Sequence, residues 1–321
     1  MRLASSSFKM HMKDQKNKTI NLRSYAKINL TLDITGVRED GYHLVDTVMQ
    51  SVDLSDRIDI SWDEKEEGEF EIKISSNKPY VPNDERNLAY KAAALMNEYA
   101  NKPGTLSIHL EKKIPVAAGL AGGSGNGAAV IVGLNKIWKL GFDTKRLCDI
   151  GKVLGADVPY CILSINTGYK CARGLNLGDE LYPVRHNLAG YVVLAKPAFG
   201  VSTKEVYAGM DSMVIENHPD SGLVIGGLKK KSFDDVYKGM GNVLELYTLT
   251  KYEGVNDLMN LMKETRNVEK VQMSGSGPTV IGFYRNEYDS KKAALSLRER
   301  GYEAYWTKMI SSFNKGGKGN D

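Results

Sequence analysis

The glycine-rich stretch 114–129 holds the residues of this 321-residue chain that are best suited to chemistry. Four of the six residues 122–127 are glycines, and apolar residues recur at helical spacing directly after them. A glycine loop that opens a helix presents unpaired backbone N–H groups and the positive end of the helix dipole, where anions bind. Glycine has no side chain, so phosphate oxygens can approach its backbone closely. The stretch therefore predicts a phosphate-binding loop, with Ser124 as the N-cap of the helix.

Several kinds of glycine loop can be compared with this stretch. It is not a Walker A loop, because no Gly-Lys-Ser/Thr follows. Gly123, Gly125 and Ala128 fit the dinucleotide pattern G-x-G-x-x-A, and Asp143 lies further on. That pattern should directly follow a strand, whereas Pro115 and small residues intervene here, so a dinucleotide site is the weaker alternative. A flexible surface loop is disfavoured, because four glycines at a helix start cost stability.

Two charged residues outside the loop are candidates for catalysis. Residues 26–34 alternate between apolar and polar, which predicts a half-buried strand with Lys27 and Asn29 on its polar face. Asp157 comes two residues before a proline, which keeps Val158 out of the helical region and places Asp157 in a rigid turn after a helix. A solvent-facing lysine and a turn or capping aspartate remain the alternative interpretations.

Composition excludes several classes of function. The formal net charge is +4, but basic and acidic residues are interspersed, so nothing favours nucleic acid. The three cysteines form no C-x-x-C pair, which indicates neither a disulfide framework nor a zinc site and fits a cytoplasmic protein. No apolar run is long enough to span a membrane. Residues 1–18 are polar and are expected to be a disordered or cloning-derived tail, with Met12 as the natural start; the oligomeric state stays open.

The remaining periodicity predicts a mixture of strands and helices. Further strands are expected at 58–62, 70–74, 106–110, 190–197 and 279–284. Helices are expected at 88–99, after the glycine loop, at 143–154, from a capping box at 202–205, at 255–265 and at 289–300. The segment 217–231 has weak periodicity and is expected to be a loop that carries the basic run 229–231. A second glycine turn, 273–278, precedes the last of these strands.

Four separated segments resemble one family of small-molecule kinases. They are Ala26-Lys27-Ile28-Asn29-Leu30, Asp40-Gly41-Tyr42-His43, Gly155-Ala156-Asp157-Val158-Pro159 and Ser274-Gly275-Ser276-Gly277-Pro278-Thr279. Together with the loop 114–129, which resembles an ATP loop, they are similar to the GHMP kinases. Within these kinases they resemble the family that acts on 4-diphosphocytidyl-2-C-methyl-D-erythritol. The likeness runs in matching order from about residue 21 to residue 284.

The resemblance implies an α+β fold of two parts. Residues 19–180 would form an N-terminal ATP-binding domain like ribosomal protein S5. Residues 181–312 would form a ferredoxin-like substrate domain, followed by a flexible tail, 313–321. The implied reaction is the ATP-dependent phosphorylation of the substrate's 2-hydroxyl in the non-mevalonate isoprenoid pathway, with the substrate in the cleft between the two parts.

The resemblance also implies site residues. Asp157 would be the general base and Lys27 its partner at the reacting hydroxyl. Asn29 and Thr203 would bind the substrate, whose cytosine would lie against Tyr42, His43 and Tyr207. Residues expected to bind ATP are Asn87, Lys112, Pro115, Ala118, Gly119, Leu120, Ala121, Gly122, Gly123, Ser124, Gly125 and Asn126. The expected partner is thus a small molecule with a cytidine diphosphate moiety, with no nucleic acid and no membrane.

The loop departs from the family pattern at two positions. Ala121 stands where the family usually has glycine, and Gly125 where it usually has a second serine. In related kinases that hydroxyl can contact Mg²⁺, so the ion is expected to be held by phosphates and water, with no protein metal site. Two alternatives stay open: a GHMP kinase for homoserine or mevalonate, and a weakened nucleotide-binding homologue. Tyr42-His43 argues against the first, and Lys27 with Asp157 against the second.

Overall fold

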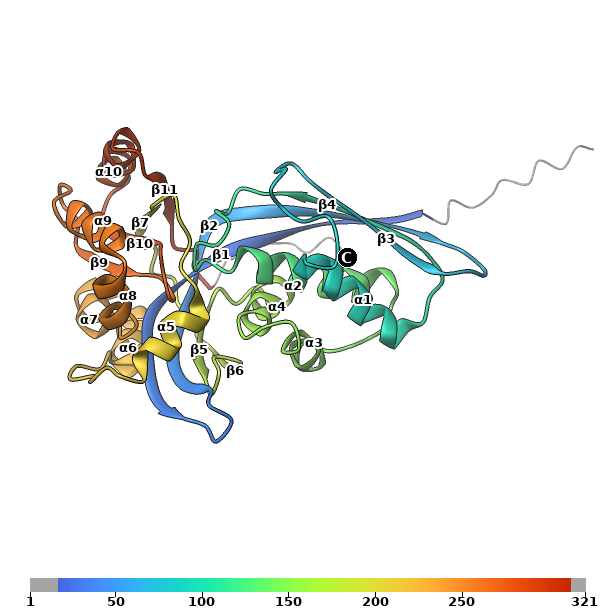
Figure 1. Ribbon diagram of the computed structural model, residues 1–321, viewed down its shortest axis with the longest axis horizontal. Helices are drawn as coiled ribbons and strands as arrows, with labels where there is room; N and C mark the ends of the chain where they lie inside the picture. The colour runs from blue at the N-terminus through green and yellow to red at the C-terminus, as the bar shows by residue number, and fades with distance from the viewer. Residues whose placement is uncertain (1–16, 313–321) are drawn as a thin grey trace, which may run out of the picture.

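The computed structural model describes residues 17–312, which form two sheets and the helices around them (Figure 1). The predicted tail 313–321 lies outside the described residues. So does most of the predicted tail 1–18, except that Asn17 and Lys18 already belong to the first strand. Within residues 17–312, no helix combines the length and apolar character needed to cross a membrane.

A seven-stranded sheet dominates the N-terminal half. Its main path runs β3-β4-β2-β1-β8, with β5 paired to β2 and β6 paired to β5. The bounds are β1 Asn17–Val37, β2 His43–Glu64, β3 Phe70–Ser76, β4 Gly104–Glu111, β5 Cys171–Leu175, β6 Glu180–Pro183 and β8 Gly241–Asn242. The long strands β1 and β2 pair antiparallel as a hairpin, and β4 separates β2 from β3. The predicted domain boundary after residue 180 falls inside β6.

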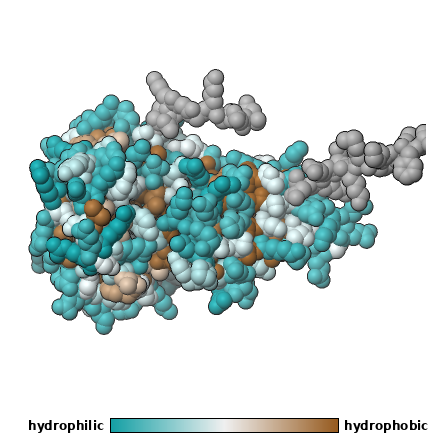
Figure 2. Space-filling model, turned by 90° about the horizontal axis from the view of Figure 1, so that it is seen from above, coloured by the Kyte–Doolittle hydropathy of each residue, from teal (hydrophilic) through white to brown (hydrophobic). Residues whose placement is uncertain are grey.

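Alternation along β2 decides which face of this sheet is covered. Ile58, Ile60 and Trp62 are buried in the core that the sheet forms with the helices α1 Leu88–Ala100, α2 Gly122–Ile137, α3 Thr144–Gly151 and α4 Val158–Thr167. The intervening Arg57 and Asp59 form an ion pair on the other face. One covered and one solvated face is the usual arrangement of an antiparallel sheet. The view from above the sheet is accordingly mainly hydrophilic, with small hydrophobic areas between polar residues (Figure 2).

The polar face of β1 does not meet solvent, so the prediction of a half-buried strand is wrong for this segment. Lys27 is only 4% exposed and Asn29 only 2% exposed. The C-terminal half covers them: its turn 274–277 approaches both side chains, and Gly275 lines the same pocket as Lys27 and Asn29. A tertiary contact between distant segments thus buries a face that local alternation marks as exposed.

The C-terminal half contains a four-stranded antiparallel sheet in the order β11-β7-β10-β9. Its strands are β7 Tyr191–Lys196, β9 Lys270–Met273, β10 Val280–Tyr284 and β11 Glu303–Lys308. Numbered along the chain this order is 4-1-3-2, which is the ferredoxin-like arrangement that the resemblance implied. The helices of this half are α5 Thr203–Met210, α6 Ser221–Lys230, α7 Phe233–Gly239, α8 Glu245–Lys251, α9 Glu253–Lys263 and α10 Glu287–Glu299.

The loop predicted at 217–231 is wrong, because α6 occupies most of it. The Asp220 side chain accepts a hydrogen bond from Leu223 N and so caps the helix start, and Lys231 ends it in the left-handed conformation. Val224 and Leu228 are buried one turn apart, but glycines lie between them and weaken the periodic signal. Part of the basic run lies in the last turn of α6, where cations complement the helix dipole.

His186 lies at the seam where residues 310–312 contact the large sheet. Its Nε2 is 2.8 Å from Gln50 Oε1 on β2, and its carbonyl accepts a hydrogen bond from Ser312 N. The Gln50 amide also donates to Ile310 O at 2.8 Å. Burial lowers the pKa of His186 from 6.5 to about 4, because the imidazolium would lose its hydration.

Because His186 is buried in its neutral form, we expect the folded protein to be less stable in acid. Between pH 6.5 and about 4 the unfolded chain binds a proton at His186 that the folded chain resists, so stability is lost as pH falls through this window. The loss should be on the order of 3 kcal/mol at most. Urea unfolding of wild type and His186→Asn at several pH values measures it. The variant should be less stable at pH 7 and lose less on acidification; equal slopes would contradict this role.

Candidate active site

The glycine loop opens α2 with a left-handed residue. Ala121 occupies the N-cap position with a φ of 57° and makes no side-chain cap hydrogen bond. The prediction that Ser124 caps this helix is therefore wrong, because α2 begins two residues earlier, at Gly122. A helix start without a side-chain cap leaves first-turn N–H groups for another acceptor. The departure at Ala121 falls where a left-handed backbone favours glycine.

Two pockets meet at this loop. The first, about 320 Å³, is lined by every residue predicted to bind ATP except Gly125, together with Arg86 and Val81. The second, about 270 Å³, is lined by Lys27, Asn29 and Asp157. Its lining also includes Thr47, Gly178, Thr203, Tyr207, Gly275 and Ser276. Both pockets share Gly119 and Ser124, so a group bound at the helix start touches both spaces.

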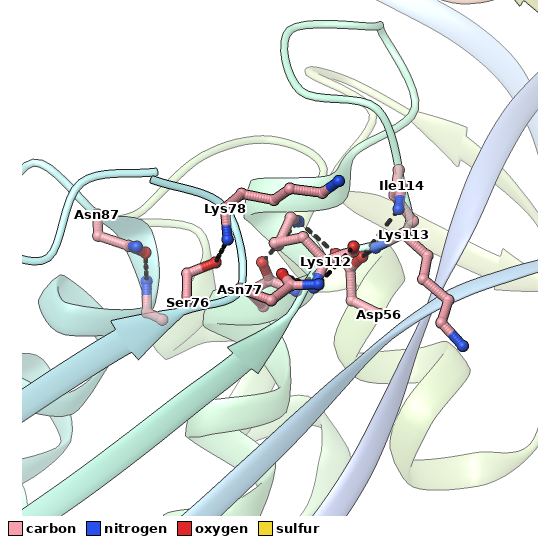
Figure 3. A network of polar contacts seen from close by, with 10 residues as sticks. Asp56, Ser76, Asn77, Lys78, Asn87, Lys112, Lys113 and Ile114 are labelled. Carbon is pink, nitrogen blue, oxygen red and sulfur yellow. Dashed lines mark hydrogen bonds and ion pairs between the residues drawn. The ribbon is translucent and has the colours of Figure 1, made fainter. Parts of the chain in front are cut away.

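A buried ion pair supports the loop from below (Figure 3). The ammonium of Lys112 contacts the carboxylate of Asp56 and donates to Asn126 Oδ1 at 2.8 Å. Asp56 also accepts hydrogen bonds from the backbone N–H groups of Lys113 and Ile114, at 2.7 and 2.9 Å. Lys112 and Asn126, predicted only as ATP ligands, thus already have partners within the protein.

Asp56 itself was missed by sequence reasoning. It is fully buried on β2, and nothing local distinguishes it from the other acidic residues of that strand. Asn87, another predicted ATP ligand, caps α1 by accepting a hydrogen bond from Ala89 N at 2.9 Å, and it lines the first pocket. These side chains hold the segments on either side of the loop.

The predicted catalytic pair is assembled. Lys27 Nζ lies 3.4 Å from Asp157 Oδ1 and donates to Asn29 Oδ1 at 2.9 Å. Asn29 in turn donates to Thr47 Oγ1 at 2.8 Å. Asp157 occupies the N-cap position of α4 but makes no cap hydrogen bond, and its side chain is 39% exposed. Its carboxylate is therefore available to a ligand in the second pocket rather than used as a cap.

Backbone contacts tie three segments together around this pair. Lys27 N donates to Leu120 O at 3.1 Å, which joins β1 to the glycine loop. Ser274 Oγ donates to Gly119 O at 3.3 Å, which joins the loop to the C-terminal half. Gly119 has a φ of +68°, and a Cβ there would lie 2.7 Å from Ser274 O. Only glycine permits this close approach.

The structure brings together only some of the residues predicted to bind the cytosine of the substrate. The rings of His43 and Tyr207 are tilted by 42° with centroids 5.4 Å apart. His43 Nε2 also lies 2.9 Å from Asp211 Oδ1, at the end of α5. Tyr42 is 62% exposed and does not line the second pocket. Burial, and the nearby charge of Asp157, raise the pKa of Tyr207, so its hydroxyl stays neutral.

One face of α5 organises this end of the pocket. Thr203, Tyr207 and Asp211 are spaced by four residues, which places them on one side of the helix. Thr203 Oγ1 lies 2.9 Å from Ser276 Oγ of the second glycine turn. Asp211 and Ser276 had no predicted role; the four-residue spacing from Tyr207 was the signal that could have found Asp211.

The donor set bears on metal binding. Among residues 17–312 no group of three or more His, Cys, Asp and Glu side chains could hold a metal ion. Of the carboxylates in the described part of the chain, Asp157 alone lines the second pocket and none lines the first. Lys27 and Lys112 contribute positive charge beside the loop instead. The arrangement suits a polyphosphate lying across the helix start with a hydroxyl acceptor beside Asp157.

Known proteins are similar to this chain over most of its length. The model of the GHMP kinases N-terminal domain matches residues 87–164, and that of the GHMP kinases C-terminal region matches residues 224–303. The 4-diphosphocytidyl-2-C-methyl-D-erythritol kinase of Exiguobacterium sibiricum is 42% identical over 292 residues, covering 91% of this chain and 98% of that protein. This chain belongs to the 4-diphosphocytidyl-2-C-methyl-D-erythritol kinase family.

A second sequence relative and two solved structures are also similar to this chain. A kinase of the same name from Clostridium botulinum is 40% identical over 294 residues, which covers 91% of this chain and all of that protein. The crystal structure of a 4-(cytidine 5'-diphospho)-2C-methyl-D-erythritol kinase gives a TM-score of 0.74 at 28% identity and covers 90% of this chain and 99% of that one. The crystal structure of a homoserine kinase from Cytophaga hutchinsonii gives a TM-score of 0.68 at 14% identity, and the match covers 97% of this chain and 98% of that one. This likeness shows the fold alone. The implied α+β fold is confirmed, and this kinase uses ATP as co-substrate.

Because Asp56 and Lys112 form a buried ion pair, we expect substitutions at the two positions to have coupled effects on the unfolding free energy. Asp56→Asn leaves the Lys112 ammonium buried without a full counter-charge, which should cost about 3–5 kcal/mol of unfolding free energy. Asp56→Asn combined with Lys112→Met removes both charges and should cost less than the single change. Urea unfolding measures Asp56→Asn, Lys112→Met and the double variant. A double variant that loses as much as the two single variants summed would show that the pair does not interact.

Proposed function

We propose that this kinase transfers the γ-phosphoryl group of ATP to the 2-hydroxyl of 4-diphosphocytidyl-2-C-methyl-D-erythritol, with Asp157 as general base. The observation that carries the proposal is the pair of pockets that meet at Gly119 and Ser124. One of them contains the Lys27–Asp157 pair. A triphosphate in the first pocket then ends where an acceptor hydroxyl in the second begins.

Asp157 would accept the hydroxyl proton as the oxygen attacks the γ-phosphorus, while the bond from that phosphorus to the bridging oxygen of the β-phosphate breaks and ADP leaves. Phosphoryl transfer asks a protein mainly for positioning and charge stabilisation, with a residue that orients the nucleophile. The Asp157 carboxylate, which is 3.4 Å from Lys27 Nζ and is not used as a helix cap, meets this need. Lys27, paired with Asp157, would stabilise the negative charge that develops on the attacking oxygen. Asn29, fixed by Lys27 and Thr47, would orient the substrate hydroxyls.

The first pocket would hold ATP. The first turn of α2 has no side-chain cap, which supports a phosphate there. Lys112 and Asn87 line this pocket while anchoring its walls, so their proposed contacts with ATP come in addition to their internal hydrogen bonds. Gly125 is outside the lining, so its proposed part in ATP binding would be indirect.

Mg²⁺ would be held by the ATP phosphates and water, and when bound it would neutralise phosphate charge. The Ser124 hydroxyl would lie near this ion, because Ser124 lines both pockets. The three cysteines are free thiols, which supports the proposal that the kinase works in the reducing cytoplasm.

Asp157→Asn tests the base directly. The amide keeps the shape of the side chain but loses its charge and basicity, so kcat should fall by more than about tenfold. ATP affinity should change little, because Asp157 lines only the second pocket. Steady-state assay with the cytidyl substrate measures kcat, and calorimetric titration with ATP supplies the control. If the variant kept more than about a tenth of wild-type kcat, a difference of roughly 1.4 kcal/mol, the assignment of the base would be wrong.

The cytosine contacts should be separable from the chemistry. We propose that the base lies between Tyr42 and Tyr207, with His43, held by Asp211, at its edge. Tyr207→Ala or Tyr42→Ala should raise KM for the cytidyl substrate roughly 5- to 150-fold, because stacking on an aromatic ring is worth about 1–3 kcal/mol per base. Phenylalanine at either position should be close to silent.

The KM for ATP is the internal control, since neither ring lines the first pocket. Unchanged cytidyl KM values in both alanine variants would show that the base is bound elsewhere. The proposed activity would then reduce to that of a GHMP kinase whose acceptor lacks a stacked base.

A further inference from the structure

A steric junction lies beneath the start of α2. Gly125 is in the first turn of this helix and faces β1 and α4. A Cβ at this position would lie 1.9 Å from Ser24 Oγ, 3.2 Å from Ser24 Cβ and 3.8 Å from Cys161 Sγ. At Gly123, two residues earlier, the nearest atom would be Leu88 Cδ1 at an ordinary 3.6 Å. The Ser24 hydroxyl thus fills the space that a side chain at position 125 would need.

The Ser24 hydroxyl has no other evident use. Ser24 is 1% exposed, and within the described part of the chain its Oγ has no hydrogen-bond partner. Burying an unpaired hydroxyl is unfavourable, and such groups are rare in native proteins. Its contribution is therefore its volume, which fits against the bare backbone of Gly125.

The junction joins the three elements that carry the reacting groups. Ser24 precedes Lys27 by three residues on β1, and Lys27 N holds Leu120 O of the loop. Gly125 follows Ser124, which lines both pockets. Cys161 follows Asp157 by four residues, one turn along α4. The packing at Ser24, Gly125 and Cys161 therefore limits how closely the lysine, the phosphate loop and the aspartate approach one another.

We infer that Ser24 is a positioning residue for phosphoryl transfer, and that its fit to Gly125 sets the distance between the phosphate loop and the Lys27–Asp157 pair. Overfilling the junction pushes the start of α2 away from β1. Underfilling it loosens the same contact. Both changes act through the phosphate loop. They leave unchanged the end of the second pocket that is proposed to bind the cytosine.

The test is a set of variants at the two positions. Gly125→Ala places a methyl group against the Ser24 hydroxyl, and it should lower kcat/KM for ATP by about 10- to 100-fold, as small displacements of catalytic parts do. Ser24→Ala leaves a void and should raise KM for ATP by about 3- to 10-fold, a smaller loss than displacement. Combining the two refills the space with a methyl group, so the double variant should be more active than Gly125→Ala alone.

Two controls separate position from stability. Gly226→Ala makes the same change inside α6, where a Cβ would meet nothing within 4 Å, and it should leave kinetics unchanged. The KM for the cytidyl substrate should be constant throughout the series. A merely structural role would lower the melting temperature and the active fraction without moving the KM for ATP. A double variant no better than Gly125→Ala, or single variants that match wild type, would overturn the inference.

The inference rests on the proposed kinase function, so nucleotide affinity is measured as well. Calorimetric titration of each variant with ATP measures the affinity of the phosphate loop for the nucleotide and does not require turnover. If the wild-type protein shows no activity on the cytidyl substrate, the proposed function fails. The ATP affinities of the variants still test whether the fit of Ser24 to Gly125 positions the phosphate loop. Should Gly125→Ala not fold, recovery of folding and ATP binding in the double variant supports the junction. A folded double variant that does not bind ATP contradicts it.

Discussion

Lys27 is the residue on which the site depends, because its ammonium and its backbone bind different parts of the machinery. The ammonium reaches Asp157 on α4 and Asn29 on its own strand, while the amide N–H holds the glycine loop at Leu120. A lysine buried to this extent needs partners, since an uncompensated buried charge is strongly unfavourable. Its position is therefore determined by the same contacts that place the aspartate and the loop.

A second buried lysine repeats this arrangement beneath the first pocket. Lys112 is held by Asp56 and Asn126, and Asp56 accepts two backbone N–H groups where the loop begins. Both lysines lie beside the helix start, one lining each pocket. Each charge is thus fixed before a ligand arrives, which is how preorganised sites stabilise developing charge without reorganisation. The second glycine turn, contributed by the C-terminal half, closes against the loop at Gly119.

The sequence was informative where function leaves a local mark. Glycines at a helix start, an aspartate before Val-Pro and a capping box all concern neighbouring residues, and each marked a feature that the structure contains. It was misleading where distant segments decide. Alternation on β1 marked Lys27 as exposed, although a turn some 250 residues later covers it, and glycines concealed α6. Asp56 and Ser24 leave no local signal, because their roles arise from contacts between β2, β1 and α2.

The most direct measurement is a crystal structure of this kinase with a non-hydrolysable ATP analogue and the cytidyl substrate bound together. The triphosphate should lie at the start of α2, and the acceptor hydroxyl should lie within about 2.6–3.2 Å of the Asp157 carboxylate, in line with the γ-phosphorus. Lys27 should contact the same hydroxyl oxygen. A substrate hydroxyl that faces another acidic or histidine side chain, with Asp157 turned away from it, would show that Asp157 is not the general base.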